Sequence, residues 1–176
     1  FGYSNEASGL ASSAVGFRNK AASENASAVG YGNNANALAA SAVGYNNTAG
    51  GVGSSTIGYN NTATNENASA FGYGNTAGGL ASSAFGFSNT ASGDNANAFG
   101  YNNIASGSKS NVFGTGNTVS GSSSNAVGTA NEVAAENSTA IGNNNTISSG
   151  AENSAALGNN ISILSLIHIS EPTRRT

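Results

Sequence analysis

A period of 14 residues runs through most of this chain and restricts its fold more than any other feature. Ten units of 14 residues begin at Phe1, and a sixteen-residue unit from Ile141 and a partial unit from Leu157 follow them. With the places in each unit numbered from 1 to 14, Gly occupies position 2 of all twelve units. Asn occupies position 5 of the eleven complete units. A fixed period of this kind predicts a solenoid, in which each repeat stacks on its neighbours.

Composition alone leaves two classes of chain open. Charged residues make up 7% of the 176 residues, and Gly, Ala, Ser, Asn and Thr dominate the remainder. This composition is typical either of a disordered low-complexity segment or of a repeat fold that requires small residues. A disordered segment has no reason to keep Gly and Asn in register over so many units. The repeat fold is therefore favoured.

The length of the unit predicts the secondary structure. Fourteen residues are too few for two helices with their connections, and the Gly and Asn content opposes helix formation. Each unit is expected to form two short strands and two turns, so the sequence predicts an all-β parallel β-solenoid, or β-roll, of 14-residue coils. The position-5 side chains would then form an amide ladder along the stack. The residues expected to shape the coil are Gly16, Gly30, Gly44, Gly58, Gly72, Gly86, Gly100, Gly114, Gly128, Asn19, Asn33, Asn47, Asn61, Asn75, Asn89, Asn103, Asn117 and Asn131.

Alternation along a strand separates small positions from bulky ones. Positions 12, 14 and 2 carry mostly Ser, Ala and Gly, and we expect them to fill the coil together with the Ala at position 7. All thirteen Phe and Tyr residues lie at positions 1 or 3, on the other face. A coil this small has room for Ala, Gly and Asn, so the aromatic face is expected outside it. The alternative is that the aromatic side chains form the core of a monomeric coil.

The bulky face changes along the chain. From Thr115 onward position 3 is polar, while position 7 enlarges to Val119, Val133 and Ile147. Before that point the apolar stripe covers at least eight coils of roughly 4.8 Å each, more than soluble monomers usually expose. Copies of the same chain around a rotation axis would cover it most simply. The expected interface residues are Phe1, Tyr3, Val15, Phe17, Val29, Tyr31, Val43, Tyr45, Ile57, Tyr59, Phe71, Tyr73, Phe85, Phe87, Phe99, Tyr101 and Phe113.

Several units resemble those of a known family. The segments 12–16 (SSAVG), 82–86 (SSAFG) and 138–142 (STAIG), within a repeated SxAφG…NxAxG pattern, are similar to the head repeats of trimeric autotransporter adhesins, the YadA-like proteins. The resemblance covers residues 1–160. It implies a left-handed parallel β-roll, a homotrimer, and a place on the cell surface of a Gram-negative bacterium. The stalk and outer-membrane anchor of the family are expected in a missing C-terminal part.

The family resemblance also implies a function, and two departures qualify it. Heads of this family bind matrix proteins, host cells or one another, so an extracellular protein or cell-surface ligand is the expected partner. Phe at position 1 and Tyr at position 3 replace the aliphatic and polar residues of better-known heads, which predicts a differently packed interface. Two other hypotheses stay open: a trimeric phage or viral tail fibre, and a monomeric solenoid that binds ice or polysaccharide.

The last residues leave the repeat. Residues 161–163 are expected to end the native sequence. Residues 164–176 (LSLIHISEPTRRT) resemble a translated sequencing adapter and contain the chain's single His and single Pro. We therefore expect this tail to be an artefact and exclude it from the fold. The alternative is that residues 161–169 form a strand that caps the open end of the solenoid.

Few groups suited to catalysis or metal binding remain without the tail. Residues 1–163 contain no His, Cys, Met, Trp or Pro, and the two lysines, Lys20 and Lys109, are isolated. A serine nucleophile would lack a base. We expect no enzyme activity, no cofactor and no metal site, and the chain has no apolar run long enough to span a bilayer. The net charge of −3 and the absence of a basic patch also disfavour nucleic acid.

The charged residues are interpreted as solvated surface. Glu24, Glu66, Asp94 and Glu136 share position 10, but the first three stand two or three coils apart, which disfavours a carboxylate pair. The other candidate surface charges are Arg18, Lys20 and Lys109. The sequence thus favours a non-catalytic adhesin head.

Overall fold

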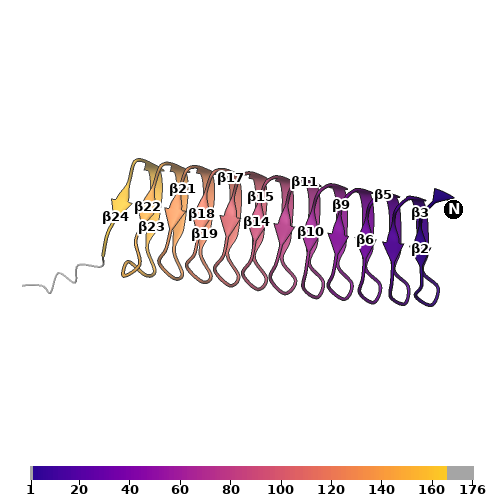
Figure 1. The fold of residues 1–176 in the computed structure, drawn as a ribbon. Coiled ribbons are helices and arrows are strands. Elements are labelled where there is room, and N and C mark those ends of the chain that lie inside the picture. Colours follow the sequence, from indigo (N-terminus) through magenta and orange to yellow (C-terminus); the bar gives the residue numbers. More distant parts are fainter. Residues whose placement is uncertain (1, 166–176) are drawn as a thin grey trace, which may run out of the picture.

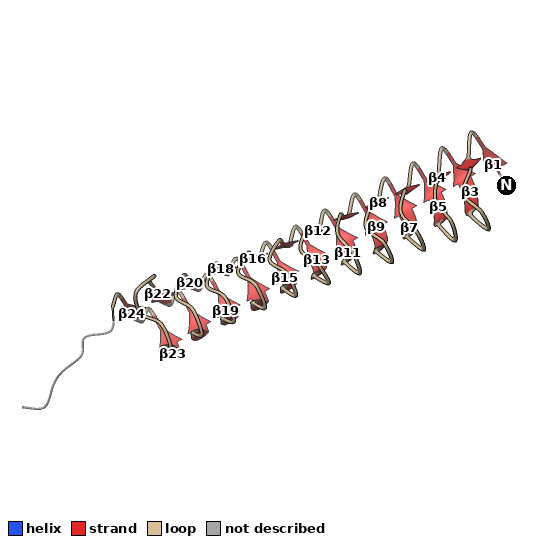
Figure 2. Cartoon of the chain, turned by 90° about the horizontal axis from the view of Figure 1, so that it is seen from below, coloured by secondary structure: helices blue, strands red, loops and turns tan. Residues whose placement is uncertain are grey.

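The computed structural model describes residues 2–165, which form a straight rod of stacked coils (Figure 1). Figure 2 shows the same rod after a quarter turn, with strands and connecting turns alternating along its length. None of the described residues is helical, and none belongs to a helix that could cross a membrane. The expected interface residue Phe1 and most of the tail, residues 166–176, lie outside the described range.

Each coil contributes one strand to each of two parallel sheets of twelve strands. The first sheet consists of β1 (Gly2–Tyr3), β3 (Ser13–Phe17), β5 (Ser27–Tyr31), β7 (Ser41–Tyr45), β9 (Ser55–Tyr59), β11 (Ser69–Tyr73), β13 (Ser83–Phe87), β15 (Asn97–Tyr101), β17 (Asn111–Thr115), β19 (Asn125–Thr129), β21 (Thr139–Asn143) and β23 (Ala155–Asn159). The second consists of β2 (Glu6–Ala7), β4 (Lys20–Ala21), β6 (Asn34–Ala35), β8 (Thr48–Ala49), β10 (Thr62–Ala63), β12 (Thr76–Ala77), β14 (Thr90–Ala91), β16 (Ile104–Ala105), β18 (Thr118–Val119), β20 (Glu132–Val133), β22 (Thr146–Ile147) and β24 (Ser162–Ile163). The predicted all-β parallel solenoid is confirmed.

Neighbouring coils pair in register, so each position stacks on the same position of the next coil. Strands β11 and β13, for example, pair Phe71 with Phe85 and Gly72 with Gly86. The sixteen-residue unit keeps this register, because Gly142 still pairs with Gly158. Its two additional residues therefore lie in the turn between β22 and β23.

Small side chains fill the coil at positions 7, 12 and 14, as predicted. Ala63, Ala68 and Ala70 in one coil are completely buried, and corresponding residues in the other coils behave alike. Larger side chains are buried toward the C-terminus, where Val119 and Ile147 occupy position 7. The space between the two sheets therefore suits Ala best and admits Val or Ile in the last coils.

The expectation that the position-2 glycines also fill the coil is wrong. They are not buried, and their φ values are positive, +116° at Gly72. This conformation breaks the alternation on which the expectation rested. A Cβ on Gly72 would lie 2.1 Å from the carbonyl oxygen of Gly86. Gly is needed here for backbone conformation and close approach between coils.

Each coil bends at two places where the backbone adopts left-handed conformations. The φ angle lies between 51° and 64° at position 4, and again at position 11 or its equivalent Asn153. Asn and Gly adopt this conformation most readily, and both occur at the two bends. Asn60 and Asn67 are examples at the two bends of one coil.

Candidate functional site

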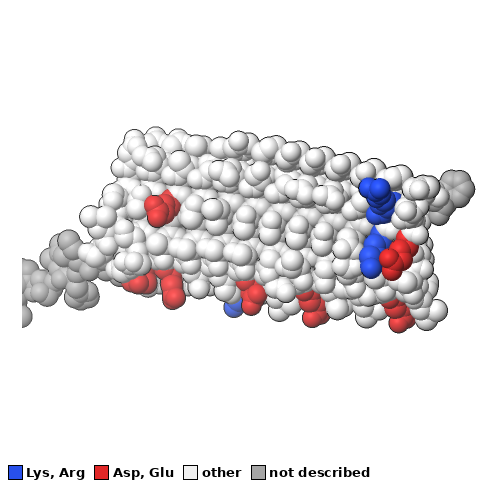
Figure 3. Space-filling view, in the orientation of Figure 1, with Lys and Arg blue, Asp and Glu red and all other residues white. Residues whose placement is uncertain are grey.

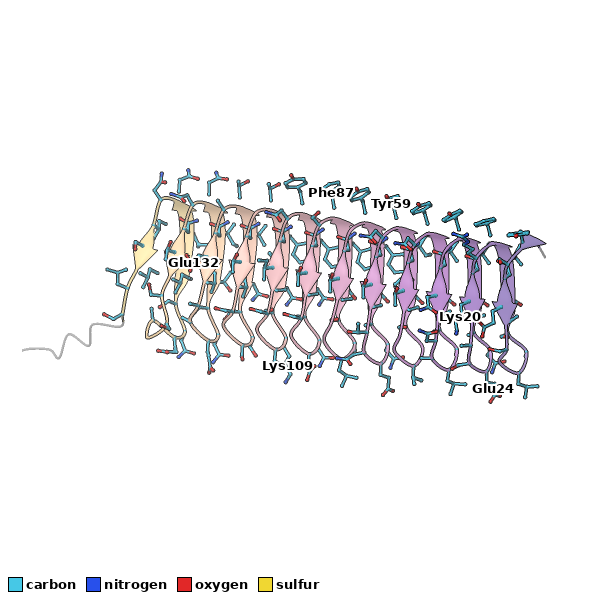
Figure 4. The ribbon with its side chains drawn as sticks, viewed as in Figure 1. Lys20, Glu24, Tyr59, Phe87, Lys109 and Glu132 are labelled. Atoms are coloured by element: carbon cyan, nitrogen blue, oxygen red, sulfur yellow. The ribbon has the colours of Figure 1, made fainter. Side chains whose placement is uncertain are left out.

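The position-3 side chains form a continuous aromatic ladder along one edge of the rod. Eight rings stack in sequence from Tyr3 to Tyr101, with centroids 4.7–5.4 Å apart and planes within 16° of parallel. Tyr59 and Phe87 mark this edge in Figure 4. In-register pairing of parallel strands causes the stacking, because it holds equivalent side chains one strand spacing apart.

A second row, at position 1, runs beside the ladder. Phe71, Phe85, Phe99 and Phe113 stack at 4.7–5.1 Å, and aliphatic residues occupy this position in the neighbouring coils. Both rows lie outside the coil: Ile57 is 46% exposed and Tyr59 is 43% exposed. The alternative in which the aromatic side chains form the core is therefore wrong. The expected interface residues from Tyr3 to Phe113 lie in these two adjacent rows.

The position-5 asparagines form a second, buried ladder that joins the coils. Asn75 Nδ2 donates hydrogen bonds to Gly86 O in the next coil (2.7 Å), to Phe71 O in its own coil (2.9 Å) and to Asn61 Oδ1 in the previous coil (3.0 Å). Its Oδ1 accepts from the backbone N–H of Asn89 (2.9 Å). The same pattern recurs from Asn19 to Asn145. This network fixes the spacing on which the aromatic ladder depends.

Sequence reasoning missed a row of exposed aliphatic residues at position 10. Leu10, Leu38, Val52 and Leu80 are between 43% and 75% exposed. They lie in the turns that precede the long strands, along the edge of the rod opposite the aromatic ladder. Acidic residues occupy position 10 in coils between them, so the row is not evident in the sequence. The signal available was the coupling of position 10 to position 11, where Leu is followed by Ala and Glu by Asn.

Charged side chains are sparse and mostly isolated (Figure 3). Within residues 2–165 the one ion pair joins Lys20 Nζ to Glu6 Oε2 at 3.4 Å, and both side chains are about half exposed. Arg18 lies over the ring of Phe17, at 5.1 Å from its centroid. Glu24 and Lys109 lie on the edge opposite Tyr59 and Phe87 (Figure 4).

The acidic residues do not assemble a chemical site in the described part of the chain. Residues 2–165 contain no group of three or more His, Cys, Asp or Glu side chains placed to hold a metal. The position-10 carboxylates of Glu24, Glu66 and Asp94 stand two or three coils apart, roughly 10–14 Å at the spacing of parallel strands. What the described surface does offer is a long apolar strip, the kind of surface that other macromolecules cover.

Comparison with known families agrees with this architecture. A family model described as the YadA head domain repeat, which spans two repeats, matches residues 7–33, 21–47, 49–75, 77–103, 91–117 and 120–145. No curated protein matches the chain. The family matches confirm the resemblance seen in the SxAφG motifs, and together they cover most of the solenoid. The chain therefore belongs to the family of YadA head domain repeats.

Proposed function

We propose that this chain is part of the head of a surface adhesin, a rod that acts by binding and carries out no catalysis. The observation that carries the proposal is the unbroken solenoid of YadA head repeats with a long apolar strip on its outside. Family membership implies an adhesin-type protein displayed on the surface of a Gram-negative cell. The sparse and isolated charges of residues 2–165 suit this role better than they suit a reaction centre.

In this proposal three copies of the chain associate side by side as left-handed β-rolls, with position 1 and position 3 at their contacts. The strip spans the eight coils that carry an aromatic ring at position 3, which is roughly 40 Å at one strand spacing per coil. Removing such a strip from water favours association by roughly 25 cal/mol for each Å² of apolar surface buried. The ligand is then bound by the faces of the trimer that remain exposed.

The ligand class is an extracellular protein or a component of a cell surface. Rods of this kind present the same backbone in every coil and vary the exposed side chains. Recognition would therefore involve a broad surface spread over several coils. In the described chain, positions 4, 6, 10 and 11 vary most in charge, with Arg18, Lys20, Glu66 and Lys109 among them.

Two measurements on the 176-residue chain test the proposal. Sedimentation equilibrium is expected to give the mass of a trimer, and the trimer is expected to bind saturably to at least one member of a panel of immobilised matrix proteins and whole cells. The variant Tyr59→Ser with Tyr73→Ser serves as the comparison in both measurements, because it removes apolar surface from the strip without touching the interior. A monomer at high concentration, or the absence of both ligand binding and self-aggregation, would contradict the proposal.

A further inference from the structure

A trimer with rotational symmetry requires two different contact surfaces on each copy. A closed ring of three is built from heterologous contacts, in which one patch of each subunit meets another patch of the next. The described chain has two exposed apolar edges. The aromatic edge is the row of rings at position 3 from Tyr3 to Tyr101, and the aliphatic edge is the row Leu10, Leu38, Val52 and Leu80.

The two edges flank the same sheet of long strands. Position 3 ends each long strand, and position 10 lies in the turn just before the next one. Figure 4 shows the aromatic edge at Tyr59 and Phe87 along one side of the rod, with Glu24 of position 10 along the other. The two edges cannot touch within one copy, because five residues of extended strand, roughly 17 Å, separate them.

Both edges carry apolar residues over the same part of the rod, with Glu24 and Glu66 interrupting the aliphatic edge. The aliphatic edge ends at Leu80, after which position 10 reads Asp94, Ser108 and Ser122. The aromatic edge ends two coils later at Tyr101. Two surfaces that pack against each other are expected to gain and lose apolar character together, whereas independent surfaces have no reason to do so.

Backbone strain accompanies the aliphatic residues. Ala11, Ala39 and Ala81 follow the three leucines at position 11 and have φ of 54°, 55° and 51°. Ala adopts this conformation at a cost of roughly 1 kcal/mol relative to Gly. The acidic turns place the favoured Asn there instead, as at Asn25 and Asn67. Lys109 and Ser123 adopt the same conformation at position 11, so the strain belongs to the turn itself. What distinguishes the leucine turns is the small apolar residue beside each leucine, which leaves room for a partner surface.

The second coil carries opposite charges at its two edges. Arg18 is the one charged residue at position 4, next to the aromatic edge, and Glu24 occupies position 10 of the same coil. Neither side chain forms an ion pair within residues 2–165. In a trimer whose axis runs along the rod, equivalent coils lie at the same level, so these two opposite charges would face each other if the two edges pair.

We propose that the aromatic edge of each copy packs against the aliphatic edge of the next copy at the same coil level, with Arg18 facing Glu24 of the partner subunit. This inference rests on the trimer of the proposed function and specifies its contacts. Rings such as Tyr31 and Tyr73 then pack on Leu38 and Leu80 of the partner subunit. Beyond Tyr101 both edges are polar, and of the apolar rows only position 1 continues, with Phe113, Val127 and Ile141 exposed.

Disulfide cross-linking tests this pairing directly, because the chain contains no cysteine. Tyr73 and Leu80 belong to one coil but to opposite edges. The double variant Tyr73→Cys with Leu80→Cys is expected to give covalent trimers on a non-reducing gel after mild oxidation. The reduced protein is examined in parallel by sedimentation, which reports the trimer independently of the cross-link.

Two matched variants define the geometry. Tyr73→Cys with Leu38→Cys places the thiols three coils apart, roughly 14 Å along the axis, and is expected to remain uncross-linked. Tyr73→Cys alone is also expected to remain uncross-linked, whereas covalent dimers would indicate ring-to-ring contact. A sedimenting trimer that does not cross-link through Tyr73→Cys with Leu80→Cys would overturn the edge pairing and leave the adhesin proposal standing. A monomer would overturn both.

Charge reversal provides a test without cysteine. Arg18→Glu and Glu24→Arg are each expected to weaken trimer association about tenfold at low salt, because each places like charges together. The double reversal is expected to restore association to within about twofold of the parent chain. The pairing would be contradicted if the two single variants weakened association equally and the two losses simply added in the double variant.

Discussion

Asn75 shows how one residue type organises the whole repeat. Its amide reaches backbone carbonyls of its own coil and the next, and its carbonyl oxygen accepts a backbone N–H from the next coil. Gly86, whose φ is +114°, supplies one of those carbonyls. The Gly at position 2 and the Asn at position 5 therefore act as one unit, and neither residue is fully explained alone.

Replacing Asn75 tests this coupling. Asn75→Ala would leave the Phe71 and Gly86 carbonyls without the Asn75 amide as their donor and remove the acceptor of the Asn89 backbone N–H. We expect a loss of about 3 kcal/mol in the free energy of unfolding, since buried unsatisfied groups are costly. Urea denaturation followed by circular dichroism measures it. The control is Asn36→Ala, an exposed position, and equal effects of the two changes would refute the ladder's role.

At the scale of the element, the sequence predicted the stacked strands but not the direction of every side chain. Period and composition were sufficient to place Ala63 and Ala70 inside and Tyr59 outside, because ordinary strand alternation decides both. Alternation failed at Gly72, where φ is positive, a conformation that the sequence pattern did not reveal. The aliphatic edge was missed because Leu38 and Leu80 are separated by acidic and other residues.

The end of the aromatic ladder offers a prediction at this scale. Thr115 pairs with Tyr101 across β17 and β15, so Thr115→Tyr would extend the stack by one ring. We expect a gain of about 1 kcal/mol in unfolding free energy from ring stacking, together with a stronger near-ultraviolet circular dichroism signal. The control Thr118→Tyr lies on the short-strand sheet, away from the ladder. A gain of the same size in Thr118→Tyr would show that the effect comes from added surface and not from stacking.

At the scale of the whole molecule, the rod depends on contacts between nearest neighbours. Each strand pairs with equivalent strands 14 residues away, or 16 at the long unit, and the core is a chain of small contacts repeated along the axis. Such an array has no single centre on which the rest depends. The long unit also shows that a turn near position 10 accepts two more residues while the strands stay in register.

Deleting whole and partial coils tests this modularity. Removing residues 57–70 deletes one complete unit and restores every position of the remaining coils, so we expect a folded rod with nearly the parent's mean residue ellipticity. Removing residues 57–63 deletes half a unit and brings Thr64 to the place of Ile57, directly after Thr56. The short strand and its Asn would then be lost from one coil, leaving the carbonyl of Gly72 without its donor. We expect this variant to lose several kcal/mol of stability in urea denaturation, and equal stability of the two deletions would show that the coil is not the unit of the fold.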